Sequence, residues 1–145
     1  MRFEYPKNVR FECKRCALCC GDTETRNRSI LMMQIEAYRI MKKALIDLDE
    51  FAERIECSEP YIYRMKKTEK GQCFFLQNKS CSIYQVRPVI CRFYPFQLEN
   101  TRDDRYVFSY TKECQGIGEK SLLTKHFFQE LFSEFMEVLK KNRRF

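Results

Sequence analysis

The chain has 145 residues, of which 44% are hydrophobic, and its thirteen Phe favour a domain with a packed core over a disordered chain. Its formal net charge is +7, and no apolar run approaches the roughly 20 residues that span a bilayer, so we expect no membrane association. The first six residues contain no apolar segment of signal-peptide type, which favours a cytoplasmic protein.

The N-terminal part of the sequence predicts an extended segment that leads into a cysteine cluster. Residues 1–12 roughly alternate apolar and polar side chains, as in a short strand. Four cysteines then occur within eight residues: Cys13, Cys16, Cys19 and Cys20. The glycine at position 21 begins a predicted turn.

Two helices are predicted after this turn. Residues 30–44 place apolar side chains at helical spacing, and Ser29 is a suitable N-cap. Asp47 and Glu50 match a capping box, and the apolar residues after Asp47 follow the i, i+3, i+4, i+7 pattern. We therefore expect a second helix that ends near residue 56.

The second half of the chain predicts short strands and one long helix. Residues 61–66 and 106–110 suit strands, and residues 77–80 suit a tight turn between Cys73 and Cys81. From residue 120 to 141, apolar side chains form one wide helical face, and Glu137 and Lys141 form a favourable i,i+4 pair.

These elements predict an α+β fold. We expect one small, irregular, cysteine-rich domain over residues 1–145, in which helices over 30–56 and 120–141 pack round short strands and metal sites hold the loops. The cysteine-cluster region is expected at 10–118, and 120–141 is expected to be a core-covering helix. A partner-binding role for that helix is the alternative.

Metal binding is the main functional prediction. A reducing compartment disfavours structural disulfides, and the odd total of nine cysteines would leave one thiol unpaired. The spacing of Cys13, Cys16 and Cys19 can turn three sulfurs toward one centre, as in ferredoxin-type runs. Cys20 is adjacent to Cys19, so we expect it to reach a second metal or to bridge.

Iron–sulfur ligation and zinc ligation are both compatible with the cysteine spacing. All-cysteine zinc sites often use two Cys-x2-Cys pairs, whereas the remote cysteines here are widely separated, which favours iron–sulfur, with a 4Fe-4S cluster as the expected form. Anionic thiolates would also offset part of the positive charge, which weakens an inference to nucleic acid. Cys57 and the single histidine, His126, are expected to be bystanders.

Two arginines flank Cys91 in a segment that prolines stiffen. Arg87 and Arg92 are predicted to face the cluster, because an anionic cluster needs nearby cations or hydrogen-bond donors. The alternative is an arginine pair on the surface.

The order and spacing of these motifs resemble the YkgJ-type CxxCxxCC cysteine-cluster family, also described as a zinc- or iron-chelating domain. The resemblance covers residues 10–118 and rests on Cys13–Cys20, the segments at Cys73 and Cys81, Arg87–Pro95 and Cys114-x-Gly116. It implies a ligand set that consists of Cys13, Cys16, Cys19, Cys20, Cys73, Cys81, Cys91 and Cys114.

The resemblance implies little about activity. Similar domains occur in flagellin lysine methylases, but no separate methylase region and no Gly-rich nucleotide loop is visible here. The leading hypothesis is an iron–sulfur protein that transfers electrons or supports a maturation or modification partner. A zinc-stabilised interaction module and a nucleic-acid-binding zinc protein are the alternatives. No catalytic residue or substrate site can be identified from the sequence.

Overall fold

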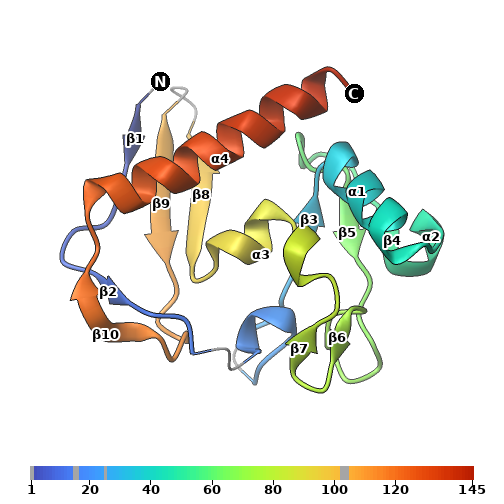
Figure 1. Cartoon of the computed structure of the whole chain (residues 1–145), viewed down its shortest axis with the longest axis horizontal. Helices are drawn as coiled ribbons and strands as arrows, with labels where there is room; N and C mark the ends of the chain where they lie inside the picture. The colour runs from blue at the N-terminus through green and yellow to red at the C-terminus, as the bar shows by residue number, and fades with distance from the viewer. Residues whose placement is uncertain (1, 15–16, 25, 102–104) are drawn as a thin grey trace.

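The fold has two halves that lie side by side, with a short helix between them (Figure 1). Two hydrophobic clusters form its core. The structure is a computed structural model, and it describes residues 2–14, 17–24, 26–101 and 105–145. Both α-helices and several small sheets are present, so the predicted α+β class is confirmed.

The first half of the molecule is a three-stranded sheet covered by the long C-terminal helix (Figure 1). The strand order is β1-β9-β8, where β1 is Phe3–Glu4, β9 is Tyr106–Tyr110 and β8 is Phe96–Asn100. Helix α4, Lys125–Arg143, runs across this sheet. Their shared core is aromatic: the ring centroids of Phe96 and Phe128 lie 5.1 Å apart in an edge-to-face contact.

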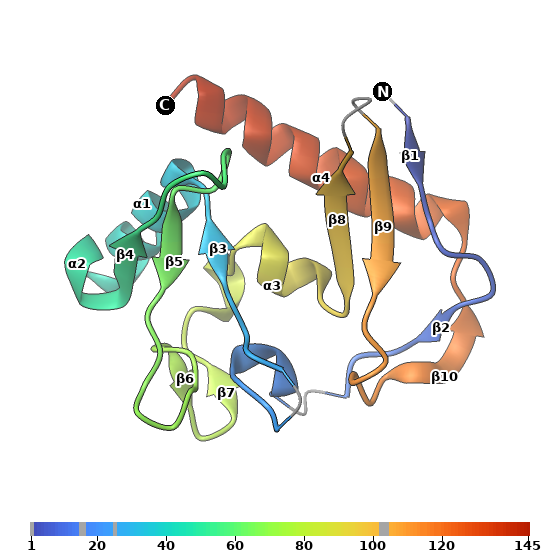
Figure 2. The same cartoon turned by 180° about the vertical axis from the view of Figure 1, so that it is seen from behind.

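The second half contains a smaller sheet and two helices (Figure 2). Its strand order is β3-β5-β4, with β3 at Leu31–Met32, β5 at Tyr63–Met65 and β4 at Ala52–Arg54. Helices α1, Gln34–Ala44, and α2, Leu48–Phe51, lie beside this sheet.

The remaining elements include a short helix that lies between the two halves, while the others form the lower edge in Figure 1. They are the 3-10 turns η1, Leu18–Cys20, and η2, Tyr84–Val86; the helix α3, Val89–Phe93; and the strand pairs β6–β7, Leu76–Gln77 with Ser80–Cys81, and β2–β10, Arg10–Phe11 with Ile117–Leu122. In the described ranges, no helix is both long and apolar enough to cross a bilayer.

Both predicted N-terminal helices differ from the structure. Residues 30–33 are not helical, because Ile30 and Met32 pair through their carbonyls with the amides of Met65 and Ile62, and α1 begins only at Gln34. The second helix stops after one turn, since Ala52 is extended and joins the sheet as the first residue of β4. The expected capping hydrogen bond from Asp47 does not form.

The predicted strands over 61–66 and 106–110 are confirmed as β5 and β9, and the terminal helix is confirmed with a later start. Residues 117–122 pair with β2 instead of beginning the helix, and the Thr124 side chain caps α4 by accepting a hydrogen bond from the Phe127 amide. The predicted Glu137–Lys141 pair forms, with Nζ and Oε1 2.9 Å apart.

Candidate metal centre

Six of the eight predicted ligands line a single cavity of about 340 Å³, which we call the cysteine cavity. It lies where η1, the β6–β7 hairpin and α3 meet. Four separate segments contribute thiols, and apolar side chains such as Ile30 and Met65 complete the wall. The six cysteines are Cys13, Cys19, Cys20, Cys73, Cys81 and Cys91.

The η1 turn presents two adjacent thiols to this cavity. The Cys20 amide donates to the Ala17 carbonyl at 3.0 Å, which closes the turn, and Ala17 itself adopts φ 66°. The sulfurs of Cys19 and Cys20 lie 3.8 Å apart. Cys20 therefore opens onto the same cavity as Cys19, and the expectation that it reaches a second metal or bridges stays a prediction. Cys16 lies outside the described residues.

The segment around the β6–β7 hairpin supplies two more thiols, Cys81 from β7 and Cys73 from the chain just before β6. Its turn residues Asn78 and Lys79 have φ values of 48° and 62°, which suit the tight two-residue turn that sequence predicted between Cys73 and Cys81. The Phe75 amide donates to the Cys73 sulfur at 3.4 Å, and the Ile83 amide donates to the Cys81 sulfur. Each sulfur thus has an amide donor two residues further along the chain.

The cysteine turn and the hairpin are joined through their backbones. The Cys73 amide donates to the Cys20 carbonyl at 2.5 Å, and Gly21 forms an isolated β-bridge with Gln72. Gly21 is packed so closely that a Cβ there would lie 2.9 Å from the Gly71 carbonyl oxygen. A side chain at position 21 would push the two cysteine segments apart.

Helix α3 carries the sixth thiol, and a buried carboxylate fixes the start of this helix. The Val89 amide donates to Oε2 of Glu36 at 2.6 Å, and the Met33 amide donates to Oε1 at 3.0 Å. One side chain, 4% exposed, therefore joins the N-termini of α1 and α3. Cys91 is held at its place in the cavity wall through this contact.

Arg28 is a buried residue beside the cysteine cavity, whose wall it does not line, and the sequence analysis did not single it out. Its Nε donates to the Cys19 carbonyl at 2.9 Å and its Nη2 to the Ile90 carbonyl at 3.4 Å, so it joins the η1 turn to α3. The guanidinium also lies 5.1 Å from the ring centroid of Tyr94. Except for Cys19, the partners of its side chain are distant in sequence, so no local pattern marks this residue.

The two arginines that were predicted to face the cluster have different surroundings. Arg87 lines the cysteine cavity, and its guanidinium lies 3.7 Å from the ring centroid of Tyr84. Arg92 does not line the cavity and forms an ion pair with Glu134 of α4. The structure thus brings one of the two arginines to the cavity wall.

The thiols differ in acidity. The hydrogen bond from the Cys20 thiol, helped by the charges of Arg28 and Arg87, lowers the pKa of Cys19 to about 6 despite burial. The same pairing raises the pKa of Cys20, and burial raises the pKa of Cys73 to about 11 and that of Cys91 to about 12. Near neutral pH, Cys19 is the first thiolate, and a metal must displace protons from the others.

Three further residues from the sequence analysis lie away from the cavity. Cys57 is exposed, and His126 pairs with Glu130 at 3.0 Å on the exposed side of α4, so both stand apart from the thiols as expected. Cys114 is buried but is not part of the cavity wall. Its neighbour Gly116 packs against Glu12, with its carbonyl accepting the Glu12 amide at 3.0 Å, so the Cys-x-Gly segment abuts the chain just before Cys13.

The donor set fits a thiophilic metal, although the cavity is not a closed coordination shell. Thiolates select zinc, copper(I) and iron–sulfur clusters over hard cations. Among the described residues, no three cysteine, histidine or acidic side chains are close enough together to hold one ion as placed. Metal binding would therefore draw the six cavity thiols inward.

The family comparison agrees with this donor set. The family model described as "CxxCxxCC: Putative zinc- or iron-chelating domain" matches residues 12–121. The chain belongs to this family. Membership confirms the resemblance seen in the motifs and supports binding of zinc or iron.

Two relatives come from Methanocaldococcus jannaschii, and both are named as uncharacterized proteins. MJ0661 is 29% identical over 120 residues, which cover 78% of this chain and 61% of the relative. MJ0939 is 26% identical over 149 residues, which cover 90% of this chain and 49% of the relative. The chain thus spans about half to three-fifths of these relatives. No solved structure matches the chain.

An exchange of Arg28 for lysine tests how strongly the guanidinium holds the cavity wall. Lysine keeps the charge but cannot bridge the Cys19 and Ile90 carbonyls with a planar fork, so we expect a loss of about 2 kcal/mol in unfolding free energy. Urea unfolding measures this loss of unfolding free energy. Arg87→Lys is the matched control, because among the described residues the Arg87 side chain donates one hydrogen bond, to the Tyr84 carbonyl at 2.9 Å. Equal losses in the two variants would contradict the bridging role.

Proposed function

We propose that this chain is an iron–sulfur protein that transfers electrons to, or supports the maturation or modification of, a protein partner. The observation that carries the proposal is the convergence of six thiols from four segments on one cavity of about 340 Å³. A 4Fe-4S cluster held by four of these thiols is the expected form. Free thiols of this kind suit a reducing compartment, in keeping with a cytoplasmic protein.

The size of the cavity favours a cluster over a single ion. A structural zinc site closes four sulfurs round one ion at about 2.3 Å, which leaves no space between the ligands. Six thiols around a cavity of about 340 Å³ give room for several iron and sulfide ions. The same donor set allows a ligand arrangement in which not every thiol binds.

The charges and amides around the thiols favour an anionic centre. Arg28 and Arg87 place positive charge beside Cys19, and two backbone amides donate to the sulfurs of Cys73 and Cys81. Hydrogen bonds and cations near a cluster stabilise its reduced form and raise its reduction potential. When bound, the cluster would supply one-electron redox chemistry.

The rim of the cavity supports contact with a redox partner. Cys13 is exposed, and Tyr84, which lines the cavity, is 45% exposed. Phe74, next to Cys73, is 38% exposed. Exposed aromatic side chains beside a redox centre provide a surface on which an electron-transfer partner can dock.

Anaerobic purification from cells supplied with both iron and zinc tests the proposal. We expect a brown protein with visible absorption, with iron and acid-labile sulfide in equal amounts, and with an electron paramagnetic resonance signal after reduction. Cys57→Ser should leave the iron content unchanged, because this thiol is exposed and distant from the cavity. A colourless protein that holds zinc and no sulfide would exclude an iron–sulfur function.

A further inference from the structure

Strand β8 has one free edge. It is the last strand in the order β1-β9-β8, so within the described part of the chain it pairs with β9 alone. Hydrogen bonds from the Thr101 amide to the Arg105 carbonyl at 2.7 Å and from the Thr111 amide to the Pro95 carbonyl at 3.1 Å fix the ladder. Since bonded pairs alternate in an antiparallel ladder, Phe96, Leu98 and Asn100 direct their backbone groups outward.

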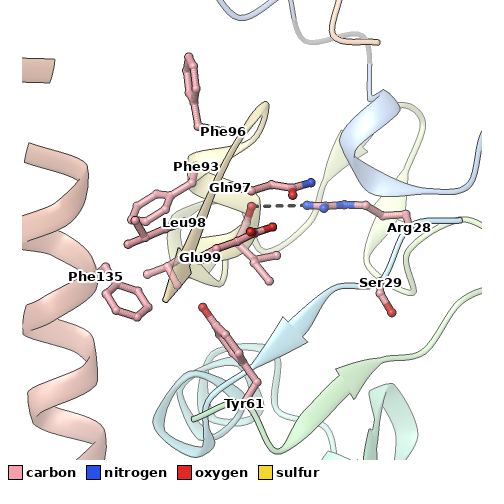
Figure 3. Close-up of a pocket in the computed structure, with 11 residues that line it drawn as sticks. Arg28, Ser29, Tyr61, Phe93, Phe96, Gln97, Leu98, Glu99 and Phe135 are labelled. Atoms are coloured by element: carbon pink, nitrogen blue, oxygen red, sulfur yellow. Dashed lines mark hydrogen bonds between the residues drawn. The ribbon is translucent and has the colours of Figure 1, made fainter. Parts of the chain in front are cut away.

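A groove runs along this free edge. Its first part is a cavity of about 240 Å³ that contacts four consecutive β8 residues, from Phe96 to Glu99 (Figure 3). Consecutive side chains point to opposite faces of a strand, so a cavity that contacts all four lies along the backbone edge. Figure 3 shows the ring of Phe96 turned away, which leaves its backbone at the cavity.

The groove continues past the middle of the strand. A second cavity of about 670 Å³ adjoins the first, and both contact Tyr61, Leu98 and Phe135. It extends to Asn100 and to Arg143 near the end of α4. The groove is therefore walled by three parts of the chain: strand β8, helix α4 and the segment around Tyr61.

Two polar side chains reach into the first cavity from the far wall. Arg28 and Tyr61 approach the strand from different directions in Figure 3. Arg28 is 8% exposed and donates from Nε and Nη2, while its Nη1 makes no hydrogen bond to a described residue. The Tyr61 hydroxyl makes none within the described ranges either. The groove thus offers backbone groups along one wall and a buried cation at one end.

We propose that the edge of β8 binds an extended peptide segment of a partner protein as an added strand. The outward amides and carbonyls of Leu98 and Asn100 supply main-chain hydrogen bonds, as in other cases of strand addition. An acidic side chain of the peptide pairs with Arg28, whose buried guanidinium is the complementary charge.

The walls of the groove favour a single extended segment over a second copy of this chain. Phe135 and Tyr61 stand on either side of the edge, so the sheet of a folded partner would collide with α4 or with the Tyr61 segment. An isolated strand needs only the width of one backbone, about 4.8 Å from β8. The proposal rests on this edge and on Arg28, which also donates to the Cys19 carbonyl, and it does not depend on which metal the cysteines hold.

A proline at position 98 tests the edge directly. Leu98→Pro removes an outward amide but no ladder bond to β9, and proline is tolerated on such a free edge. Leu98→Ala is the matched control, because it removes similar side-chain contacts and keeps the amide. The probe is a random heptapeptide library displayed on phage and selected on the full chain. The enriched peptides are then synthesised with a fluorescent label, and their affinity is measured by fluorescence anisotropy.

We expect enriched peptides to bind the wild type and Leu98→Ala, and to bind Leu98→Pro at least tenfold more weakly. Replacement of their acidic residue by its amide should also weaken binding at least tenfold. Amide hydrogen exchange of the wild type provides a second readout that needs no variant to fold. Bound peptide should slow exchange at Leu98 and Asn100 and leave Gln97 and Glu99, already bonded to β9, unchanged.

Three results would overturn the proposal. They are a selection that enriches no peptide, equal affinity for the proline and alanine variants, and peptides whose protection maps away from β8. A dimer that forms through β8, seen by analytical ultracentrifugation and abolished by Leu98→Pro, would assign the edge to a second copy instead.

Discussion

Replacement of Cys91 by serine is expected to remove most of the bound metal and to lower the thermal midpoint by about 10 °C or more. A hydroxyl is a poor ligand for a thiophilic metal, and α3 offers no other thiol to take its place. A metal present at a thousand times its dissociation constant adds about 4 kcal/mol to the stability of the folded state. For a chain of this length each kcal/mol corresponds to a few degrees.

The measurement is metal content by elemental analysis together with a thermal unfolding scan. Cys57→Ser is the matched control, since Cys57 is exposed and does not line the cysteine cavity. Cys114→Ser adds a second comparison, because Cys114 is buried outside the cavity wall. A Cys91→Ser protein that holds as much metal as Cys57→Ser would show that the cavity is not the metal centre.

The sequence predicted those elements whose pattern is long or whose turn chemistry is specific. The apolar face of α4 repeats over several turns, and the Asn78-Lys79 turn joins β6 to β7, with Cys81 in β7 and Cys73 just before β6. The predicted start of α1 at residue 30 was wrong because Ile30–Met33 is a continuous apolar run. Such a run fits a buried strand as well as a helix, and only its pairing with β5 decides between them.

Strands β8 and β10 were not predicted from the sequence, because their patterns are short or absent. β8 alternates apolar and polar residues from Phe96 to Glu99, but this pattern lasts only four residues and directly follows Pro95. β10 has one half-buried residue, Ile117, followed by five exposed ones, so it carries no alternation to detect. Its pairing with β2 depends on a partner more than a hundred residues away.

The cysteine spacing predicted a metal centre, but the surroundings of that centre depend on tertiary contacts. Arg92 follows Cys91 directly, and successive residues of a helix point about 100° apart. On α3 this places Arg92 toward Glu134 while Cys91 lines the cavity. Arg28 and Glu36 show the converse, because each has a partner over fifty residues away, Ile90 and Val89, that no local pattern reveals.

Glu36→Gln is expected to lower the unfolding free energy by about 2 kcal/mol at pH 7. The Glu36 carboxylate accepts two backbone amides, from Met33 and Val89, in a site that is 4% exposed. An amide side chain can offer its oxygen to one of them, so its NH₂ group must face the other donor. A buried donor without an acceptor costs about 1–3 kcal/mol.

The loss of unfolding free energy in Glu36→Gln should change with pH, and the pKa of Glu36 determines whether it grows or shrinks. Burial raises this pKa above its ordinary value of 4.5, although the two amides and the charges of Arg92 and Arg39 oppose the shift. The folded state therefore holds the proton more tightly than the unfolded chain does. Stability from this group is fully present below pH 4.5 and is lost as the pH rises through the folded pKa.

Glutamine does not titrate, so the wild type should gain stability relative to Glu36→Gln as the pH falls from 7 toward 4.5. Urea unfolding at the two pH values measures the difference. Glu50→Gln on α2 is the control, because Glu50 is exposed and its change should stay within about 0.5 kcal/mol. A Glu36→Gln protein as stable as the Glu50→Gln control at pH 7 would mean that the carboxylate does not hold α1 and α3 together. In that case, the position of Cys91 would have to be fixed by the packing of Val89 and Phe93 alone.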